Sequence, residues 1–196
     1  MAVGSLDRAG RIEQLRTFAR CQVWSGYRSD ADVRAEVYDA ALAEERNPDR
    51  AQVLTDEVLA AARDDLDTAR ATWPAYGGFD RLQDAFADLR AADVVVLEAV
   101  DDHWTANERL TRDRAAGRAP RGIAYFTHSD VWHAVEHGML EINVWHGTSA
   151  NVAPGDDLLD MVIDTLRSHG IAAIFDEGRI EATLGWQRRP STGPVR

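Results

Sequence analysis

Near residue 93 the spacing of the hydrophobic residues changes from a helical period to a strand-like one, and this change limits the folds open to the chain. Before it, apolar residues recur every three or four positions, as on one face of a helix. Helices are predicted from about residue 6 to 22, from Ser29 or Asp30 to Arg46, from Asp49 to Ala71, and after the glycine pair at 77–78. We therefore expect a helical region over residues 1–92.

After residue 93, short β-branched runs and alternating segments dominate. Strands are predicted at 94–97, from residue 122, at 139–146, and in a final hairpin that turns at "DEGR", with helices after Asp130 and Pro154. Residues 101–120 fit a loop or an exposed helix. The order predicts an α+β fold, in which residues 93–189 form a two-layer α/β sandwich with a mixed or antiparallel sheet of about five strands. We expect one compact unit with the helical part, followed by a flexible tail at 190–196.

The segment "MLEINVWH" alternates most clearly between apolar and polar residues. Its two faces consist of Leu140, Ile142 and Val144 on one side and Glu141, Asn143 and Trp145 on the other. Such alternation is typical of an edge strand or of a sheet covered on one side only. Trp145 is therefore expected either to be covered by the helical half or to belong to an interaction surface.

Composition places the chain among soluble globular proteins. Of its 196 residues 45% are hydrophobic and 28% charged, and no uncharged run approaches the roughly 20 residues of a membrane span. The N-terminal segment lacks the basic flank and apolar core of a signal peptide, so we expect a cytoplasmic protein without membrane association. Cys21 is the single cysteine, which excludes an internal disulfide and favours a packing role.

The formal net charge of −11 bears on partners. Nucleic-acid binding depends on clustered positive charge, and the arginines here are dispersed among carboxylates, so no nucleic-acid partner is expected. A basic protein is the more natural partner. The chain has no lysine, which excludes Schiff-base chemistry and a phosphate loop ending in Gly-Lys.

The segment "HAVEH" has the form H-x-x-E-H of inverted zinc peptidases, in which two histidines bind Zn²⁺ and the glutamate is a base. If Asp130 caps this helix, Val131, Ala134 and Val135 form its buried stripe, and His133 and His137 lie on the outer face. A catalytic zinc also needs a third protein ligand and a shaped cavity. We therefore favour a solvated polar face.

An alternative remains, because His128 and His146 lie near strand ends. If the fold gathered His128, Asp130, His133, His137 and His146, they would form a metal or proton-handling site, with a divalent ion such as Zn²⁺ as cofactor. The leading expectation is that no cofactor is used.

Three segments resemble a bacterial family known as a domain of unknown function. They are "ATWPAYGGFDRLQDAFADLRAADVVV", "RGIAYFTHSDVWHAVEHGMLEINVW" and "LRSHGIAAIFDEGRIEATLGWQRR", which together extend from Ala71 to Arg189. The family pattern contains a W-P dipeptide, a D-R-L-x-x-A-F-x-x-L helix and a G-Y-x-F-x-H-x-x-D strand end. The resemblance implies a shared fold and supplies no activity.

Two departures from the family pattern concern chemistry. The cysteine cluster that members often carry after the first strand is absent here, and the paired histidines His133 and His137 are not part of the pattern. The positions that do match are Trp73, Pro74, Asp80, Arg81, Leu82, His128 and Asp130. The resemblance points to a functional surface at Trp73, Asp80, Arg81, His128 and Asp130. Trp145 is added to these candidates on the alternative that its indole belongs to an interaction surface.

Two functions are therefore expected. The first is a non-enzymatic binding or regulatory protein, monomeric or homodimeric, whose acidic surface engages a basic protein, as a toxin-neutralising immunity protein does. The second is a small metal-dependent or His/Asp-based hydrolase centred on His128 and Asp130, with the neighbouring histidines. A salt-sensitive partner would favour the first, because electrostatic attraction is screened as salt rises.

Overall fold

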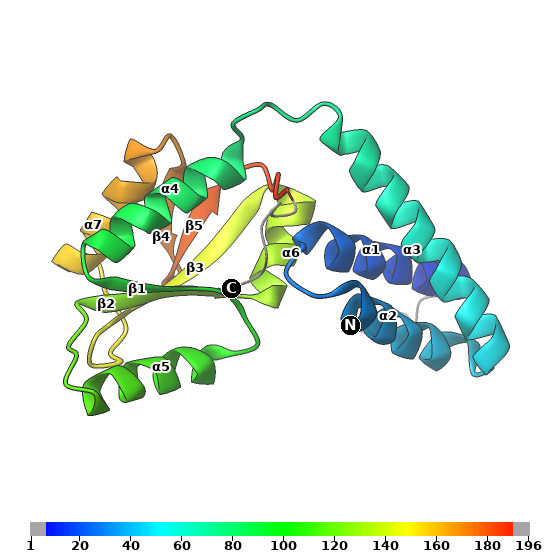
Figure 1. Cartoon of the computed structure of the whole chain (residues 1–196), viewed down its shortest axis with the longest axis horizontal. Helices are drawn as coiled ribbons and strands as arrows, with labels where there is room; N and C mark the ends of the chain where they lie inside the picture. Colours follow the sequence, from blue (N-terminus) through cyan, green and yellow to red (C-terminus); the bar gives the residue numbers. More distant parts are fainter. Residues whose placement is uncertain (1–6, 190–196) are drawn as a thin grey trace, which may run out of the picture. The chain divides into compact units, whose positions relative to one another are not determined.

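The computed structural model describes residues 7–189, which divide into two compact units (Figure 1). The helical unit contains residues 7–73 with residues 188 and 189, and the sheet unit contains residues 74–187. Residue 6, the expected helix start, and the tail at 190–196 lie outside the described residues. Within the described range, no helix is both long and apolar enough to cross a bilayer.

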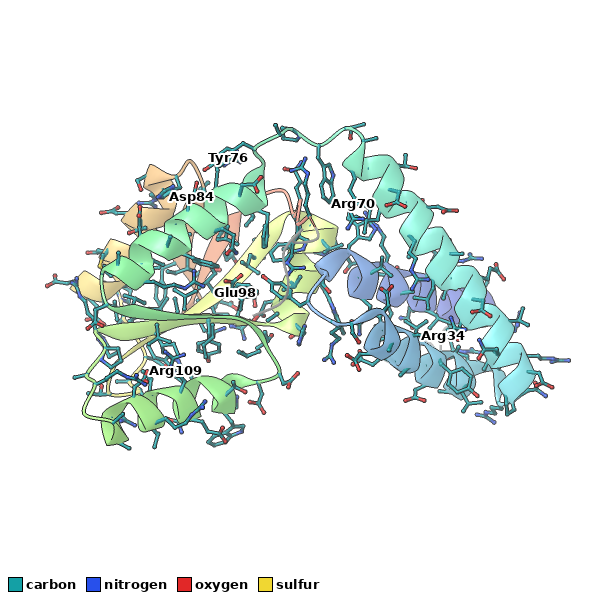
Figure 2. All side chains as sticks on the ribbon, in the orientation of Figure 1. Arg34, Arg70, Tyr76, Asp84, Glu98 and Arg109 are labelled. Atoms are coloured by element: carbon teal, nitrogen blue, oxygen red, sulfur yellow. The ribbon has the colours of Figure 1, made fainter. Side chains whose placement is uncertain are left out.

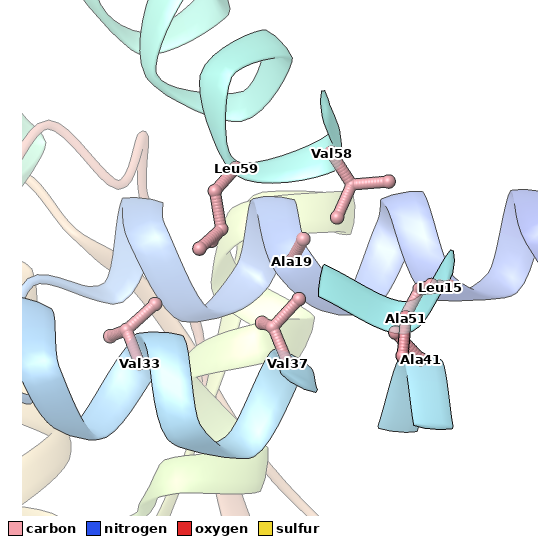
Figure 3. Packing of buried hydrophobic residues seen from close by; sticks show 8 residues of the cluster. All are labelled: Leu15, Ala19, Val33, Val37, Ala41, Ala51, Val58 and Leu59. Atoms are coloured by element: carbon pink, nitrogen blue, oxygen red, sulfur yellow. The ribbon is translucent and has the colours of Figure 1, made fainter. Parts of the chain in front are cut away.

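The helical unit consists of three helices, α1 (Arg8–Ser25), α2 (Asp30–Glu45) and α3 (Pro48–Arg70). Their apolar stripes meet in one core (Figure 3), formed by Leu15, Ala19, Val33, Val37, Ala41, Ala51, Val58 and Leu59. Small residues dominate this cluster, which lets the helices approach closely. The predicted 3.6-residue periodicity is confirmed in all three helices.

Polar caps set the beginnings of these helices. Ser29 caps α2, because its side chain accepts a hydrogen bond from the backbone N–H of Asp32. Asn47 caps α3 in the same way, and Pro48 follows in the first helical position, where its missing N–H leaves no donor unpaired. The dipeptide that ends one predicted helix therefore also starts the next.

The boundary between the units lies after Trp73, not at residue 92 as expected. Helix α4 (Gly78–Ala91) packs on the first strand of the sheet and on α7 (Asp157–Ser168). Its apolar stripe includes Leu82, Phe86 and Leu89, all fully buried, and Phe86 stacks on Phe126 of the sheet at 6.1 Å between ring centroids. Periodicity reveals the buried face of a helix but not its partner, so the fourth helix was assigned to the wrong neighbours.

The sheet unit carries five strands and the remaining helices. In chain order after α4 these are β1 (Val94–Val100), α5 (His103–Ala115), β2 (Gly122–Thr127), α6 (His128–His137), β3 (Met139–His146), α7, β4 (Ala172–Asp176) and β5 (Arg179–Thr183). The sheet is mixed, with strand order β1-β2-β3-β5-β4, and only β1 and β2 run parallel. The α+β class, the helical N-terminal part and the five-stranded mixed sheet are confirmed.

The two faces of the sheet are covered unequally. Helices α4 and α7 pack on the face that carries Leu140, Ile142 and Val144, all buried (Figure 1). The opposite face is covered in part by α5, whose main contacts with the sheet are with β1 and β2. The polar face of β3 is approached by α6, which contacts this strand and brings His133 to 3.9 Å from Glu141.

The segment left open between a loop and an exposed helix is helical, and it is α5. Its inner side contributes Ala106 and Leu110 to a small core with β1 and β2. On its outer side Arg109 (labelled in Figure 2) donates to the buried carboxylate of Asp113 at 2.9 Å, one helical turn away. The charged pattern that obscured this helix in the sequence thus contributes to its stability.

Candidate functional site

A cavity of about 950 Å³ lies on the polar face of the sheet, beside α5. It is bordered by the ends of β1 and β2, the start of α6, the polar side of β3, the loop at 151–154 and the β4–β5 turn. Because β1 and β2 are parallel, their carboxyl ends reach the same edge of the sheet, the usual place for ligands in such arrangements. This cavity is the candidate site.

The end of β1 is irregular where it reaches the cavity. The pairing register with β2 shifts between Leu97 and Val100, and Ala99 adopts a left-handed backbone conformation with φ of 48°. Such bulges redirect a strand and are common beside binding sites. Immediately after the bulge, Asp101 and Asp102 border the cavity, and Asp102 also caps α5 by accepting from the Thr105 N–H.

The floor of the cavity is the polar face of β3 together with its neighbour on β2. Asn143 lies directly opposite Tyr125 in the antiparallel register, so both side chains project to the same side. The Trp145 indole packs edge-on against the Tyr125 ring, with 4.9 Å between centroids. Burial, reinforced by the Asp130 charge, raises the pKa of the Tyr125 phenol to about 12, so this side chain stays a neutral donor.

Glu141 is the central carboxylate of the floor. It forms a salt bridge with Arg179, the first residue of β5, and its other oxygen lies 3.9 Å from the His133 imidazole of α6. The Glu141 side chain is only 17% exposed, whereas that of Arg179 is 50% exposed. The carboxylate is therefore held in place while its guanidinium partner borders open space.

Asp130 was expected to cap α6, but its role in the structure is different. Thr127, not Asp130, caps α6, and the helix begins at His128. Asp130 is the third residue of a capping box, and its Oδ2 accepts from both the N–H of Thr127 at 2.7 Å and its hydroxyl at 2.8 Å. Burial raises the pKa of the Asp130 carboxyl, although the Thr127 hydrogen bonds lower it in part.

This raised pKa gives a testable pH dependence. The Asp130 carboxyl binds its proton more tightly in the folded protein than in the unfolded chain. The free energy of unfolding therefore falls as pH rises from the ordinary pKa of 3.8 through the raised pKa of the folded state. Asp130→Asn keeps one oxygen for both Thr127 donors and removes the charge. We therefore expect this variant to lose that decline and to be more stable than the wild type near neutral pH.

Urea unfolding at several pH values checks the expectation. Asp164→Asn, which removes an exposed carboxylate of α7, is the matched control and should keep the pH dependence of the wild type. Parallel stability curves for Asp130→Asn and the wild type would show that Asp130 does not titrate as described.

The four histidines considered as metal ligands do not converge. The rings of His133 and His137 lie 5.5 Å apart on the outer side of α6, while His128 lies 3.8 Å from Asp101 and His146 lies 3.0 Å from Asp156. Of these histidines only His133 borders the cavity. Among residues 7–189 no group of three or more His, Cys, Asp or Glu side chains is placed to hold a metal ion.

The remaining predicted residues have positions that suggest structural roles, with one exception. Trp73 ends the helical unit, where its ring packs edge-on with Trp24 at 6.4 Å. Asp80 accepts from the Gly77 N–H in the capping box of α4, and Arg81 of the same helix approaches Gly170. The exception is Trp145, which borders the cavity and is half-buried against α5, the helix that covers it.

Several cavity residues were not selected from the sequence. Glu141 and Asn143 belong to the alternation that was recognised in β3, but Trp145 was the residue of their face that was selected as a candidate. Glu177 lies in the β4–β5 turn, where it and Gly178 both have positive φ as in a tight hairpin. Arg179 follows the turn as the first residue of β5. The usable signal was the row of polar residues along one face of β3. Nothing in the sequence indicated that the turn lies beside it.

The charges around the cavity are unbalanced. Five carboxyl groups border it, against one guanidinium and two imidazoles; the carboxyl groups are those of Asp101, Asp102, Asp130, Glu141 and Glu177. Aromatic rings of Tyr125 and Trp145 form part of the same lining. The arrangement can attract a positively charged group and place it against aromatic surface.

Comparison with other proteins gives one result on ancestry. Neither a curated protein nor a solved structure matches the chain. The sequence model of one family matches residues 8–190, a range that covers nearly the whole chain and both units. The resemblance seen in the sequence is thus confirmed at the level of the family: the chain belongs to the family described as domain of unknown function DUF6891.

Proposed function

We propose that this protein is a non-enzymatic binding protein that receives a basic segment of a partner protein in the cavity on the polar face of its sheet. The observation that carries the proposal is the excess of carboxyl groups around a cavity that also has aromatic lining. Neutralisation of a basic toxin is one role that such chemistry suits.

Electrostatics supports this choice on two scales. The net charge of −11 attracts a basic partner from a distance and excludes most acidic ones. Within the cavity, the Glu141 carboxylate pairs with Arg179 and is only 17% exposed, and Glu177 lies on a tight turn. Preorganised charges of this kind lose little entropy when a ligand binds.

The aromatic side chains favour a cation over a neutral ligand. Trp145 and Tyr125 pack edge to face beside the carboxylates, and His103 packs edge-on against Trp145 with 6.5 Å between centroids. A guanidinium or ammonium group above an indole face gains roughly 0.5–2 kcal/mol, more when water is excluded. An arginine side chain can use this surface and the carboxylates at the same time.

The size and lining of the cavity favour a peptide over an apolar small molecule. Its volume of about 950 Å³ is at the upper end of the range for small-molecule sites. Such sites are lined mainly by hydrophobic side chains, whereas this lining is mainly polar and charged. A short basic segment supplies several groups that can pair with the dispersed carboxylates.

Removal of one cavity charge tests the proposal. Glu177→Asn removes a carboxylate at the turn and retains a residue that tolerates positive φ. We expect it to weaken binding of a fluorescein-labelled hexa-arginine peptide about threefold, because an exposed charge contributes roughly 0.2–1 kcal/mol. Fluorescence anisotropy at about 50 mM and about 300 mM NaCl measures the affinity and its salt dependence.

The control separates the cavity from the overall charge. Asp164→Asn makes the same change of charge on α7 of the same unit, and Asp164 does not border the cavity. It should change the affinity much less than Glu177→Asn. Equal losses in both variants would mean that the peptide responds only to net charge, and absence of binding at about 50 mM salt would overturn the proposal.

The alternative of a His/Asp-based hydrolase receives less support from the geometry. One observation favours it, the raised pKa of Asp130 beside the cavity, since such shifts accompany general acids. However, both protons that Asp130 accepts come from Thr127, and His128 lies beside Asp101, outside the cavity lining. Such chemistry needs a nucleophile and a base within hydrogen-bond reach of each other, whereas the observed contacts pair His128 with Asp101 and Asp130 with Thr127.

A further inference from the structure

A second cavity, of about 420 Å³, lies in the helical unit and has the opposite charge character. It is bordered by residues from α1, the connection to α2, α3 and the segment at 188: Gln22, Val23, Gly26, Arg28, Asp30, Val33, Arg63, Leu66, Asp67, Arg70 and Arg188. Four guanidinium groups and two carboxylates are among them. This excess of positive charge is notable in a chain whose net charge is −11.

The four arginines converge from three separate segments. Arg63 and Arg70 are seven residues apart on α3, so they lie on one face two turns from each other. Arg28 lies in the connection between α1 and α2 and forms a salt bridge with Glu36 of α2 at 2.6 Å, so an entering anion would share this guanidinium with Glu36. Arg188 stacks over the Tyr27 ring, 4.3 Å from its centroid, and donates to the carbonyl oxygen of Gly26. Stacking and a backbone acceptor fix the position of its planar group.

The two carboxylates of the lining are weak competitors for these groups. Asp30 is 3.9 Å from Arg63 and its side chain is 94% exposed, while Asp67 is 3.3 Å from Arg70 and is 74% exposed. Exposed ion pairs of this kind contribute little free energy and exchange readily with solvent. Both aspartates can therefore turn outwards when an anion enters.

We infer that this cavity binds a multivalent oxyanion, a small molecule that carries phosphate or several carboxylate groups. Arginine presents paired N–H donors in a plane, which match two oxygens of a phosphate or carboxylate. Several such forks around one cavity favour an anion with more than one charged group. The inference is independent of the proposed function, because the two cavities lie in different units.

Isothermal titration calorimetry of the full chain with pyrophosphate and with citrate tests the inference. Saturable binding with a Kd below about 1 mM is expected for at least one of them. Tighter binding of pyrophosphate would identify phosphate as the recognised group, and tighter binding of citrate would identify carboxylate. No saturable binding of either anion would overturn the inference.

Variants locate the bound anion. Arg63→Gln should weaken binding at least about fivefold, because it removes one charged fork. Arg34→Gln on α2 (labelled in Figure 2) is the matched control, since Arg34 pairs with Asp56 and does not border this cavity. Equal losses in the two variants would show diffuse charge attraction and contradict the assignment.

A gain of affinity separates binding from misfolding. Asp67→Asn removes a competing carboxylate near the C-terminal end of α3, where negative charge is unfavourable for the helix dipole. It should tighten anion binding about threefold at unchanged or higher stability. Asp64→Asn, on the same helix but outside the cavity lining, should leave the affinity nearer that of the wild type. Absence of this difference would count against the inferred site.

Discussion

Replacement of Glu141 by glutamine is expected to weaken binding of a basic peptide about tenfold, since a hydrogen bond to a charged group contributes roughly 1.5–3 kcal/mol. The Glu141 side chain is only 17% exposed, and glutamine has nearly the same shape. The loss should therefore come from charge. Stability should change by about 1 kcal/mol or less, because Arg179 is half exposed and water can solvate it.

Replacement of Arg179 by glutamine should have the opposite effect on the same peptide. Arg179 is the only guanidinium that borders the cavity among the described residues, and it competes with a ligand for Glu141. Its removal leaves the carboxylate available and makes the cavity more negative, so we expect affinity to rise about threefold. The double variant, whose net charge equals that of the wild type, should bind with intermediate affinity.

Anisotropy titrations of the four proteins give a double-mutant cycle. Opposite signs for the two single variants are the decisive result, because a loss of structure would weaken binding in both. If both single variants bind less well than the wild type, the Glu141–Arg179 pair is a structural contact and the cavity does not use its carboxylate for a ligand. Unchanged affinity in both would place peptide binding elsewhere.

Much of the fold follows from local patterns in the sequence. Ser29, Asn47 and Pro48 act at helix ends as their chemistry dictates, and the alternation at 139–146 separates buried from polar residues as expected. These features depend on neighbours within a few positions. Two predictions were wrong. Helix α4 was grouped with the N-terminal helices because its packing partners, β1 and α7, cannot be read from its own periodicity. Asp130 was predicted to cap α6, but Thr127, three residues earlier, is the cap.

The candidate site was harder to predict for the same reason. Its carboxylates come from the loop after β1, helix α6, strand β3 and the β4–β5 turn, segments that meet only because β3 lies between β2 and β5. The sequence shows each segment but not this strand order. Motif matching directed attention to His133 and His137, whereas the polar face of β3, visible in the alternation, was the better guide.

Replacement of Gly78 by alanine should be the most destabilising of the changes considered. A Cβ there would lie 2.6 Å from the carbonyl oxygen and 2.8 Å from the amide nitrogen of Gly185, backbone atoms that cannot move without displacing the chain after β5. Overpacking of this kind lowers the free energy of unfolding by about 1–3 kcal/mol. We expect a loss of about 3 kcal/mol here, because both atoms that the Cβ would meet belong to the backbone.

Gly77 provides a matched control one residue earlier. A Cβ at Gly77 would meet the Gln187 amide oxygen at 2.3 Å, the end of a flexible side chain that can rotate away. Gly77→Ala should therefore cost about 1 kcal/mol, mainly the hydrogen bond that Gln187 accepts from the Gly78 N–H. Equal losses of stability in urea unfolding would mean that α4 does not approach the Gly185 backbone closely.

Because α4 covers the face of the sheet opposite the cavity, folded Gly78→Ala protein should still bind the hexa-arginine peptide. This result would separate the architecture of the sheet unit from its proposed binding function.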